Sequence, residues 1–183
     1  TRRSTLSTFY YFPTDCPHRE KNGCTGDISL SAEHTLLNRS AENSYREWMR
    51  SVRKDQSEEG SLNGIIPSSE WGRNYGPVWD GVVVNIPYYT YVYRGERKIL
   101  EENGLGDWCA PGCRCNPKAP VEVTNSICAY DIYQKAAYLF EQTGWKMQKD
   151  VCIALAEEIR SSIRKKLIDF STMTVEGDTQ TGQ

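Results

Sequence analysis

The sequence predicts an all-α protein built from antiparallel helical hairpins. Several long segments repeat apolar residues every three to four positions, which is typical of helices with one face in a core. Polar connections rich in glycine and proline separate these segments, and the one strand-like run, VVVNI, lies within a helical pattern. We therefore expect neighbouring helices to pack in pairs, joined by loops.

The C-terminal part shows the pattern most clearly. Apolar residues recur every four positions at Val151, Leu155, Ile159, Ile163 and Leu167, and charged residues occupy the other faces. This spacing predicts a long amphipathic helix that begins after about Lys146. A similar spacing runs upstream from Val123 to Phe140 and stops at Thr143-Gly144, a typical helix end. The two segments are expected to form a hairpin.

Three further helices are expected in the N-terminal part. The first covers Ile28 to Asn38, with Asp27 as a suitable N-cap. The second follows Ser40, another suitable N-cap, and buries Tyr45, Trp48, Met49 and Val52. The third spans about Trp79 to Asn103, where Pro87 is expected to kink the helix or mark its first turn.

Composition narrows the class of protein. The chain has 183 residues and 38% hydrophobic residues, enough for one compact domain. Its 22 basic and 24 acidic residues give a net charge of −2 with no basic block, so we expect no nucleic-acid partner. No apolar run reaches the roughly 18 to 20 residues of a membrane span, and the first residues lack the apolar core of a signal peptide.

The cysteines do not indicate a metal site. There are seven, an odd number, and the densest group is Cys109, Cys113 and Cys115 in WCAPGCRC. Three thiolates could bind a soft metal, but a structural zinc site needs a fourth ligand, and both histidines lie far upstream. We expect this segment to be a loop with reduced thiols or one disulfide, and we expect no metal and no cofactor.

Acidic and basic side chains are concentrated in DCPHREKNGCTGD, from Asp15 to Asp27. Pro13, just before this segment, and Pro17 within it stiffen the backbone, and glycines allow tight turns. Arg19 offers a fork of donors beside Glu20. Carboxylates accept several hydrogen bonds from sugar hydroxyls, and a glycosidase also needs one protonated carboxyl for the leaving oxygen. The segment therefore favours a polyhydroxylated ligand, although a solvated loop with a helix cap explains the same residues.

The run PTDCPHREKNGCTGD, followed by a helix with Ala32-Glu33, closely resembles the catalytic-domain signature of bacterial α-L-rhamnosidases. Three later segments resemble the same family: VWDGVVVNIPYYTY, GDW at Gly106 to Trp108, and the final DTQTGQ. The resemblance implies an inverting glycoside hydrolase with an (α/α)6 barrel. It also implies a rhamnose-containing glycan or glycoside as substrate.

The resemblance also implies roles for individual residues. Glu20 would be the general acid, and Asp15, Arg19 and Asp27 would surround the rhamnose hydroxyls. Trp79 and Trp108 would pack against the apolar face of the sugar and its methyl group. Tryptophans in long loops are often ligand platforms, but buried plugs between helices are the alternative for both. Asp80 would lie at the same site, with a helix cap as its alternative role. His18 is left without a role.

Two features depart from the family pattern. Cys24 stands where the family usually has a tryptophan, so one wall of the sugar site would be smaller. Inversion also requires a general base about 6.5 to 9.5 Å from the acid, and in the family that glutamate lies beyond the end of this chain. About five or six helical segments are recognisable, whereas six hairpins need about twelve. The expectation is the N-terminal part, about half, of a six-hairpin catalytic domain over residues 1–183, with uncovered helix faces that favour self-association.

Two other functions are compatible with the sequence. One is an (α/α)6 glycosidase that acts on another sugar, which the cysteine at the usual tryptophan position would permit. The other is a non-catalytic, carbohydrate-binding helical module. The family resemblance favours a bacterial periplasmic or extracellular location, although no residue of the chain itself indicates export.

Overall fold

The computed structural model describes residues 2–58, 60–68, 72–73, 75–102, 121–172 and 174–175. Helices account for most of this part of the chain, which confirms the all-α class. The chain divides into two compact units, Thr1–Cys113 and Arg114–Gln183. Among the described residues, none of the helices has the length and apolar character needed to cross a membrane.

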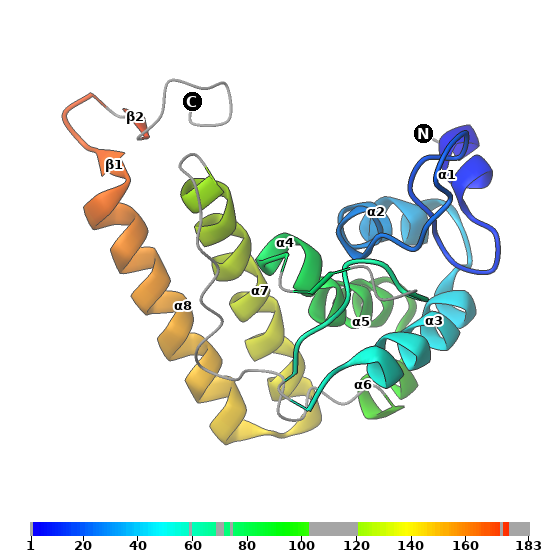
Figure 1. Cartoon of the computed structure of the whole chain (residues 1–183). Helices are drawn as coiled ribbons and strands as arrows, with labels where there is room; N and C mark the ends of the chain where they lie inside the picture. The colour runs from blue at the N-terminus through cyan, green and yellow to red at the C-terminus, as the bar shows by residue number, and fades with distance from the viewer. Residues whose placement is uncertain are drawn as a thin grey trace. The chain divides into compact units, whose positions relative to one another are not determined.

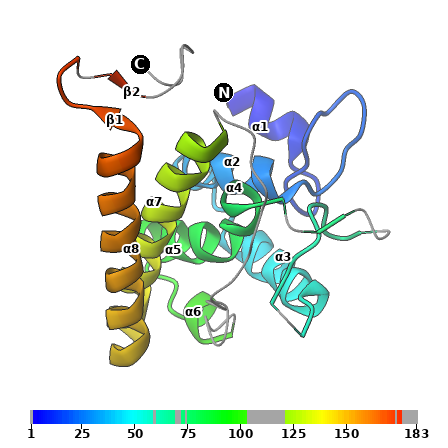
Figure 2. The ribbon, with the colours of Figure 1, turned by 60° about the vertical axis from the view of Figure 1, so that its left-hand side comes forward.

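The first unit is a small helical core. Its helices are α1 (Arg2–Thr8), α2 (Thr25–Asn38), α3 (Glu42–Asp55), α4 (Pro77–Asp80), α5 (Val82–Arg94) and α6 (Lys98–Glu102). Helix α5 packs against both α2 and α3, as Figures 1 and 2 show. The side chains of Ile28, Leu36, Tyr45, Val82 and Ile86 are fully buried between these helices. Each buried aliphatic side chain contributes about 1.5–3 kcal/mol, so this contact is the main support of the unit.

Two expected helix caps are wrong. The Ile28 N–H donates to the Cys24 carbonyl at 3.0 Å, so α2 begins at Thr25 and Asp27 lies inside its first turn. There its negative charge still complements the helix dipole. The Tyr45 N–H donates to the Ala41 carbonyl at 2.9 Å, which makes Ala41, and not Ser40, the N-cap of α3.

The helix expected from Trp79 to Asn103 is divided into three. Gly81 separates α4 from α5, and Gly95 ends α5 with a φ of 63°. Its N–H donates to the Tyr91 carbonyl at 2.8 Å, the usual closure of a helix by a left-handed residue. Pro87 lies inside α5 and is buried, rather than in its first turn. The run VVVNI is helical, as predicted.

The second unit is a helical hairpin, as the sequence predicts. Helix α7 (Val121–Thr143) and helix α8 (Lys146–Lys166) run side by side in Figure 1, and Gly144, with a φ of 82°, forms the turn. Of the predicted apolar stripe, Leu167 is buried and Leu155, Ile159 and Ile163 are half-buried, whereas Val151 is 47% exposed. Cys152 and Ala156, the buried residues of α8, complete this face. After α8, β1 (Ile168–Asp169) pairs antiparallel with β2 (Thr174–Val175), which the sequence did not predict.

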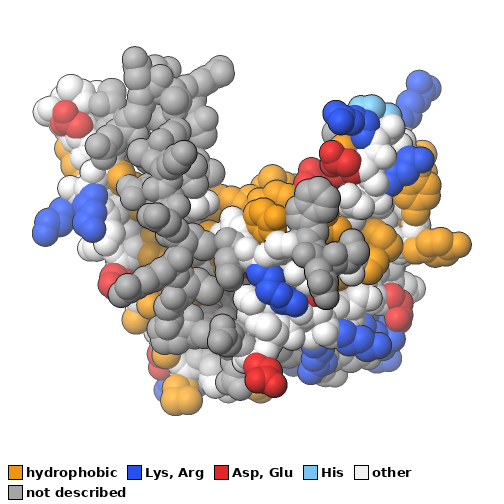
Figure 3. Space-filling model, viewed as in Figure 1, with side chains coloured by type: hydrophobic (Ala, Val, Ile, Leu, Met, Phe, Trp, Pro, Cys, Tyr) orange, Lys and Arg blue, Asp and Glu red, His pale blue; other side chains and the backbone are white. Residues whose placement is uncertain are grey.

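Large apolar side chains also lie on the surface. In the first unit, Leu30 and Leu37 of α2 are 73% and 60% exposed, two helical turns apart on one face. On the face drawn in Figure 3, hydrophobic side chains stand open to solvent among acidic and basic ones. Such a face is typical of helices that pack against further protein. Self-association through it stays a prediction.

Candidate functional site

The segment of residues 15–27, called the acidic loop below, consists of a loop and the first turn of α2. Hydrogen bonds close the loop at its base. The Asp15 N–H donates to the Asn22 carbonyl at 2.9 Å, and the Asn22 N–H donates to Asp15 Oδ1 at 2.8 Å. Lys21 has a φ of 55°, so the chain reverses at this position. The loop thus holds Asp15 at a fixed position while His18, Arg19 and Glu20 are exposed at its tip.

Carboxylates and thiols meet inside the acidic loop. The Cys16 thiol donates to Asp15 Oδ2 and to Glu20 Oε2, both at 3.4 Å, and the Cys24 thiol contacts Asp15 Oδ2 at 3.6 Å. Carboxylate oxygens of Asp15 and Glu20 and the Cys16 sulfur all lie within 4.8 Å of one another. Two of the predicted site carboxylates, Asp15 and Glu20, are therefore neighbours in space.

The pKa values of Asp15 and Asp27 are shifted in opposite directions by their surroundings. Partial burial acts to raise the pKa of Asp15, but hydrogen bonds from the Asn22 N–H, Glu20 and the two thiols outweigh it, and the pKa lies below its ordinary value. Burial, and then the charge of Asp15, raises the pKa of Asp27. Burial, with the charges of Asp15 and Asp27, also raises the pKa of the Cys24 thiol to about 12. Asp15 is thus the group most readily ionised, and Asp27 retains its proton to a higher pH.

A second loop, residues 61–66, hydrogen-bonds to the acidic loop and is called the supporting loop below. The Gly64 carbonyl accepts hydrogen bonds from the Thr25 N–H at 2.9 Å and the Thr25 hydroxyl at 3.3 Å. The Ile66 N–H donates to the Gly23 carbonyl at 2.9 Å. The Ile66 carbonyl in turn accepts the indole N–H of Trp48 at 2.8 Å, which ties the loop to the core. A Cβ on Gly23 would lie 2.0 Å from the Ile66 oxygen, so only glycine fits this approach.

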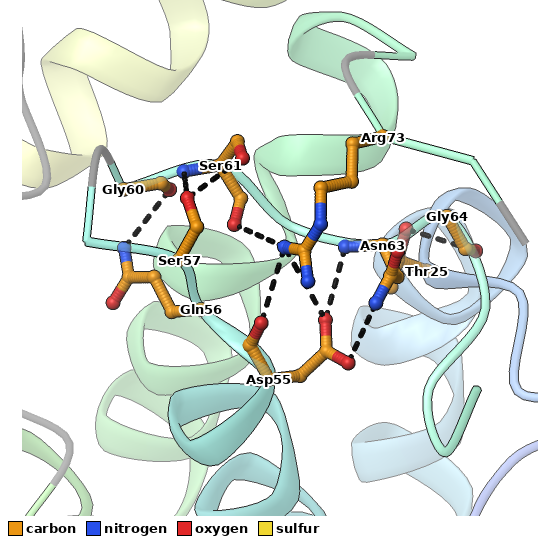
Figure 4. Close-up of polar contacts among 9 residues, drawn as sticks. All are labelled: Thr25, Asp55, Gln56, Ser57, Gly60, Ser61, Asn63, Gly64 and Arg73. Carbon is orange, nitrogen blue, oxygen red and sulfur yellow. Dashed lines mark hydrogen bonds and ion pairs between the residues drawn. The ribbon is translucent and has the colours of Figure 1, made fainter. Parts of the chain in front are cut away.

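Asp55, at the end of α3, fixes this supporting loop, as Figure 4 shows. Its carboxylate accepts the Asn63 backbone N–H at 3.0 Å and the Asn63 side-chain amide at 2.8 Å. Arg73 donates to the Asp55 carbonyl at 3.1 Å and to the Ser61 carbonyl at 2.8 Å, and its Nη1 lies 3.9 Å from the Asp55 carboxylate. One end of α3 thereby positions the segment that carries Gly64.

Trp79 lies against the acidic loop. A Cβ on Gly26 would be 2.9 Å from Cδ2 of the Trp79 ring, so the indole packs directly on the backbone beside Asp27. The ring of Tyr75 lies next to it, with centroids 5.1 Å apart and planes tilted by 33°. An aromatic surface therefore borders the carboxylates, the combination that sugar-binding sites use for apolar faces and hydroxyls.

Comparison with known proteins identifies the family. Residues 1–103 match the bacterial alpha-L-rhamnosidase 6 hairpin glycosidase domain. The chain belongs to this family. An alpha-L-rhamnosidase of Formosa agariphila is 33% identical over 96 residues, 52% of this chain and 10% of that protein. One of Alteromonas sp. is 27% identical over the same length, again 52% of this chain and 10% of the relative.

Solved structures of rhamnosidases share the fold. The alpha-L-rhamnosidase from Dictyoglumus thermophilum matches with a TM-score of 0.75 and 29% identity, covering 93% of this chain and 22% of that one. The Streptomyces avermitilis enzyme complexed with L-rhamnose matches with a TM-score of 0.79 and 22% identity, covering 98% and 20%. The predicted fold class, helical hairpins of a six-hairpin domain, is confirmed. The chain spans about a tenth to a quarter of the length of these rhamnosidases.

The structure of this rhamnosidase-family chain brings some predicted site residues together and separates others. Asp15, Glu20, Asp27 and Trp79 gather around the acidic loop. Arg19 is exposed at its tip. Asp80 is half-buried in the last position of α4; burial, partly offset by a hydrogen bond with the Gly76 backbone, raises its pKa to about 6. Its two predicted roles, at the sugar site or as a helix cap, both stay predictions. Trp108 and the cluster of Cys109, Cys113 and Cys115 lie outside the described residues.

Several residues that build the site were missed from the sequence. Asp55, Asn63 and Arg73 hold the supporting loop, but no local pattern in the sequence marks them as partners. Tyr75 could have been found, because it is an aromatic residue in a polar, glycine-bearing loop, the signal that drew attention to Trp108. Gly64 lies in the supporting loop and Gly72 lies after it, and the sequence indicates for both only that they can form turns.

Proposed function

We propose that the chain is the N-terminal part of a catalytic domain that hydrolyses terminal α-L-rhamnose from glycans or glycosides with inversion. The observation that supports this function best is the acidic loop itself, in which Asp15 lies close to both Glu20 and Asp27, and the indole of Trp79 packs on Gly26, next to Asp27. Carboxylates there are available to sugar hydroxyls, and the indole to the apolar face of the ring. The fold and the family membership agree with such a substrate.

Glu20 is the proposed general acid. It is exposed, so a bound sugar can reach its carboxyl group. Hydrogen bonds, one of them with Glu20, hold the pKa of Asp15 below its ordinary value, so Asp15 is the ionised neighbour of the proposed acid. In this proposal Asp15, Arg19 and Asp27 bind the rhamnose hydroxyls. The general base would come from a part of the catalytic domain that this chain does not supply.

The first test compares this chain with the protein extended past Gln183, using p-nitrophenyl α-L-rhamnoside and NMR of the released sugar. Inverted product from the extended protein alone would support both the rhamnosidase function and the need for a base outside the chain. If neither protein cleaves the rhamnoside but another glycoside is cleaved, the substrate assignment is wrong.

Glu20→Gln in the extended protein tests the acid. Loss of a general acid lowers kcat by about 10²- to 10⁴-fold when the leaving group needs a proton, and much less when it does not. We therefore expect a large loss with an alkyl rhamnoside and a small one with p-nitrophenyl rhamnoside. Glu47→Gln, an exposed glutamate on α3, is the matched control and should retain full activity. Equal losses on both substrates would contradict the assignment.

Asp27 is the alternative candidate for the acid, because burial and the charge of Asp15 raise its pKa. Asp27→Asn is therefore measured in the same assay. A loss with Asp27→Asn that depends on the leaving group, together with a uniform effect of Glu20→Gln, would transfer the acid role to Asp27. A higher KM with an unchanged dependence on the leaving group is expected if Asp27 binds hydroxyls.

A further inference from the structure

Tyr75 is an exposed aromatic ring that is nevertheless held tightly. Its side chain and backbone are 43% exposed. A Cβ on Gly64 would lie 2.5 Å from its ring carbons Cδ2 and Cε2, and a Cβ on Gly72 would lie 2.5 Å from its hydroxyl oxygen. The ring therefore rests on bare backbone at two glycines, a contact that any other residue would prevent.

The rings of Trp79 and Tyr75 pack on neighbouring backbone segments, one at the end of the acidic loop and one in the supporting loop. Trp79 packs on Gly26, next to Asp27, and Tyr75 packs on Gly64, whose carbonyl accepts the Thr25 N–H. Their centroids are 5.1 Å apart, with the planes 33° from parallel. The two rings thus form one aromatic cluster beside the acidic loop, in which Tyr75 is the exposed member.

Hydrogen bonds fix the backbone next to the two glycines on which Tyr75 packs. Asn63, the neighbour of Gly64, is fixed by Asp55, and Arg73, the neighbour of Gly72, is fixed by the Asp55 and Ser61 carbonyls. A preorganised ring loses little conformational entropy on binding, so stacking on it translates efficiently into affinity.

On these grounds, and resting on the proposed function, we propose that Tyr75 forms a subsite for the ring attached to the terminal rhamnose. Trp79 takes the rhamnose, and Tyr75 stacks on the flat apolar face of the leaving group, either a second pyranose or an aryl aglycone. Tyr75 thereby favours substrates in which rhamnose is linked to a ring over those with a small alkyl group.

The test uses the extended protein and four ligands: L-rhamnose, methyl α-L-rhamnoside, phenyl α-L-rhamnoside and a rhamnosyl-glucoside. Tyr75→Leu keeps apolar bulk over the two glycines but removes the flat ring, and Tyr75→Phe keeps the ring. Tyr11→Leu, at a tyrosine that is 91% exposed, is the control for a lost surface aromatic. All variants also carry Glu20→Gln and are compared in this background, so that the glycosides are bound rather than cleaved. Dissociation constants come from calorimetry, and unfolding curves verify that each variant is folded.

We expect Tyr75→Leu to weaken the two ring-bearing ligands by about five- to tenfold, the range of one aromatic stacking contact, while L-rhamnose and methyl rhamnoside bind as before. Tyr75→Phe and Tyr11→Leu should change none of the four by more than about twofold. An effect on only one ring-bearing ligand identifies whether a sugar or an aryl group is the preferred occupant. Equal weakening of all four ligands, or of none, would overturn the subsite. Failure of the unsubstituted protein to bind L-rhamnose would instead refute the proposed function on which the subsite rests.

Discussion

Replacing Gly23 by alanine should destabilise the first unit strongly. The new Cβ would lie 2.0 Å from the Ile66 carbonyl oxygen and 2.9 Å from its carbon. Ordinary contacts begin near about 3.5 Å, so the carbonyl would have to retreat by roughly 1.5 Å. Because both atoms belong to the backbone, no side-chain rotation can relieve the clash.

The size of the destabilisation follows from the hydrogen bonds that a displaced Ile66 carbonyl would break. The Ile66 carbonyl accepts the Trp48 indole N–H at 2.8 Å, and the Ile66 N–H donates to Gly23 at 2.9 Å. Trp48 is only 3% exposed, so an unpaired indole costs about 1–3 kcal/mol, and overpacking adds about 1–3 kcal/mol. We expect a loss of about 2–6 kcal/mol in the free energy of unfolding, a large part of the stability of a small domain.

Urea unfolding followed by tryptophan fluorescence measures this loss. Gly26→Ala is the matched control, because its Cβ would meet the half-buried side chain of Trp79, at 2.9 Å, and not backbone. The indole can move, and alanine is the better helix former by about 1 kcal/mol, so the net loss should stay below about 1 kcal/mol. Gly23→Ala with a midpoint within error of the Gly26→Ala midpoint would refute the argument that the two loops touch at Gly23.

Two other predictions concern ionisation. Burial raises the pKa of Asp80 to about 6, so the folded state holds a proton that the unfolded state releases near pH 4, and stability should fall as pH rises through this range. Asp80→Asn should remove that decline and stabilise the protein by about 1–2 kcal/mol at pH 7.5 but not at pH 4, as measured by urea midpoints; parallel pH profiles would contradict it. Cys24 is 7% exposed with a pKa of about 12, so iodoacetamide at pH 8 should alkylate it at least about a hundredfold more slowly than in the unfolded chain. Peptide mass spectrometry measures both rates, and comparable rates would show that the thiol is neither buried nor held protonated.

The carboxyl groups in the acidic loop differ because of their partners and not because of their type. Asp15 accepts hydrogen bonds from an N–H and two thiols, which lower its pKa. Burial and the nearby charge of Asp15 raise the pKa of Asp27. The Cys24 thiol is one of the donors that lower the pKa of Asp15.

The sequence by itself determined the helices and the chemical character of the site. Periodic apolar residues located α2, α3, α7 and α8, because helical spacing is a local property. It placed helix starts less accurately: α2 begins before Asp27, since the first hydrogen bond is made by the Cys24 carbonyl and not by a side chain. The family signature likewise lies within one continuous segment.

Only the tertiary structure decided which distant residues contact the acidic loop. The supporting loop meets Gly23 and Thr25 across about forty residues of sequence, and Trp79 reaches Gly26 from still farther along the chain. Such contacts depend on how α2, α3 and α5 pack, and no short-range pattern encodes them. The sequence therefore supplied the carboxylates, and the packing of distant segments gave them their pKa values and their aromatic neighbours.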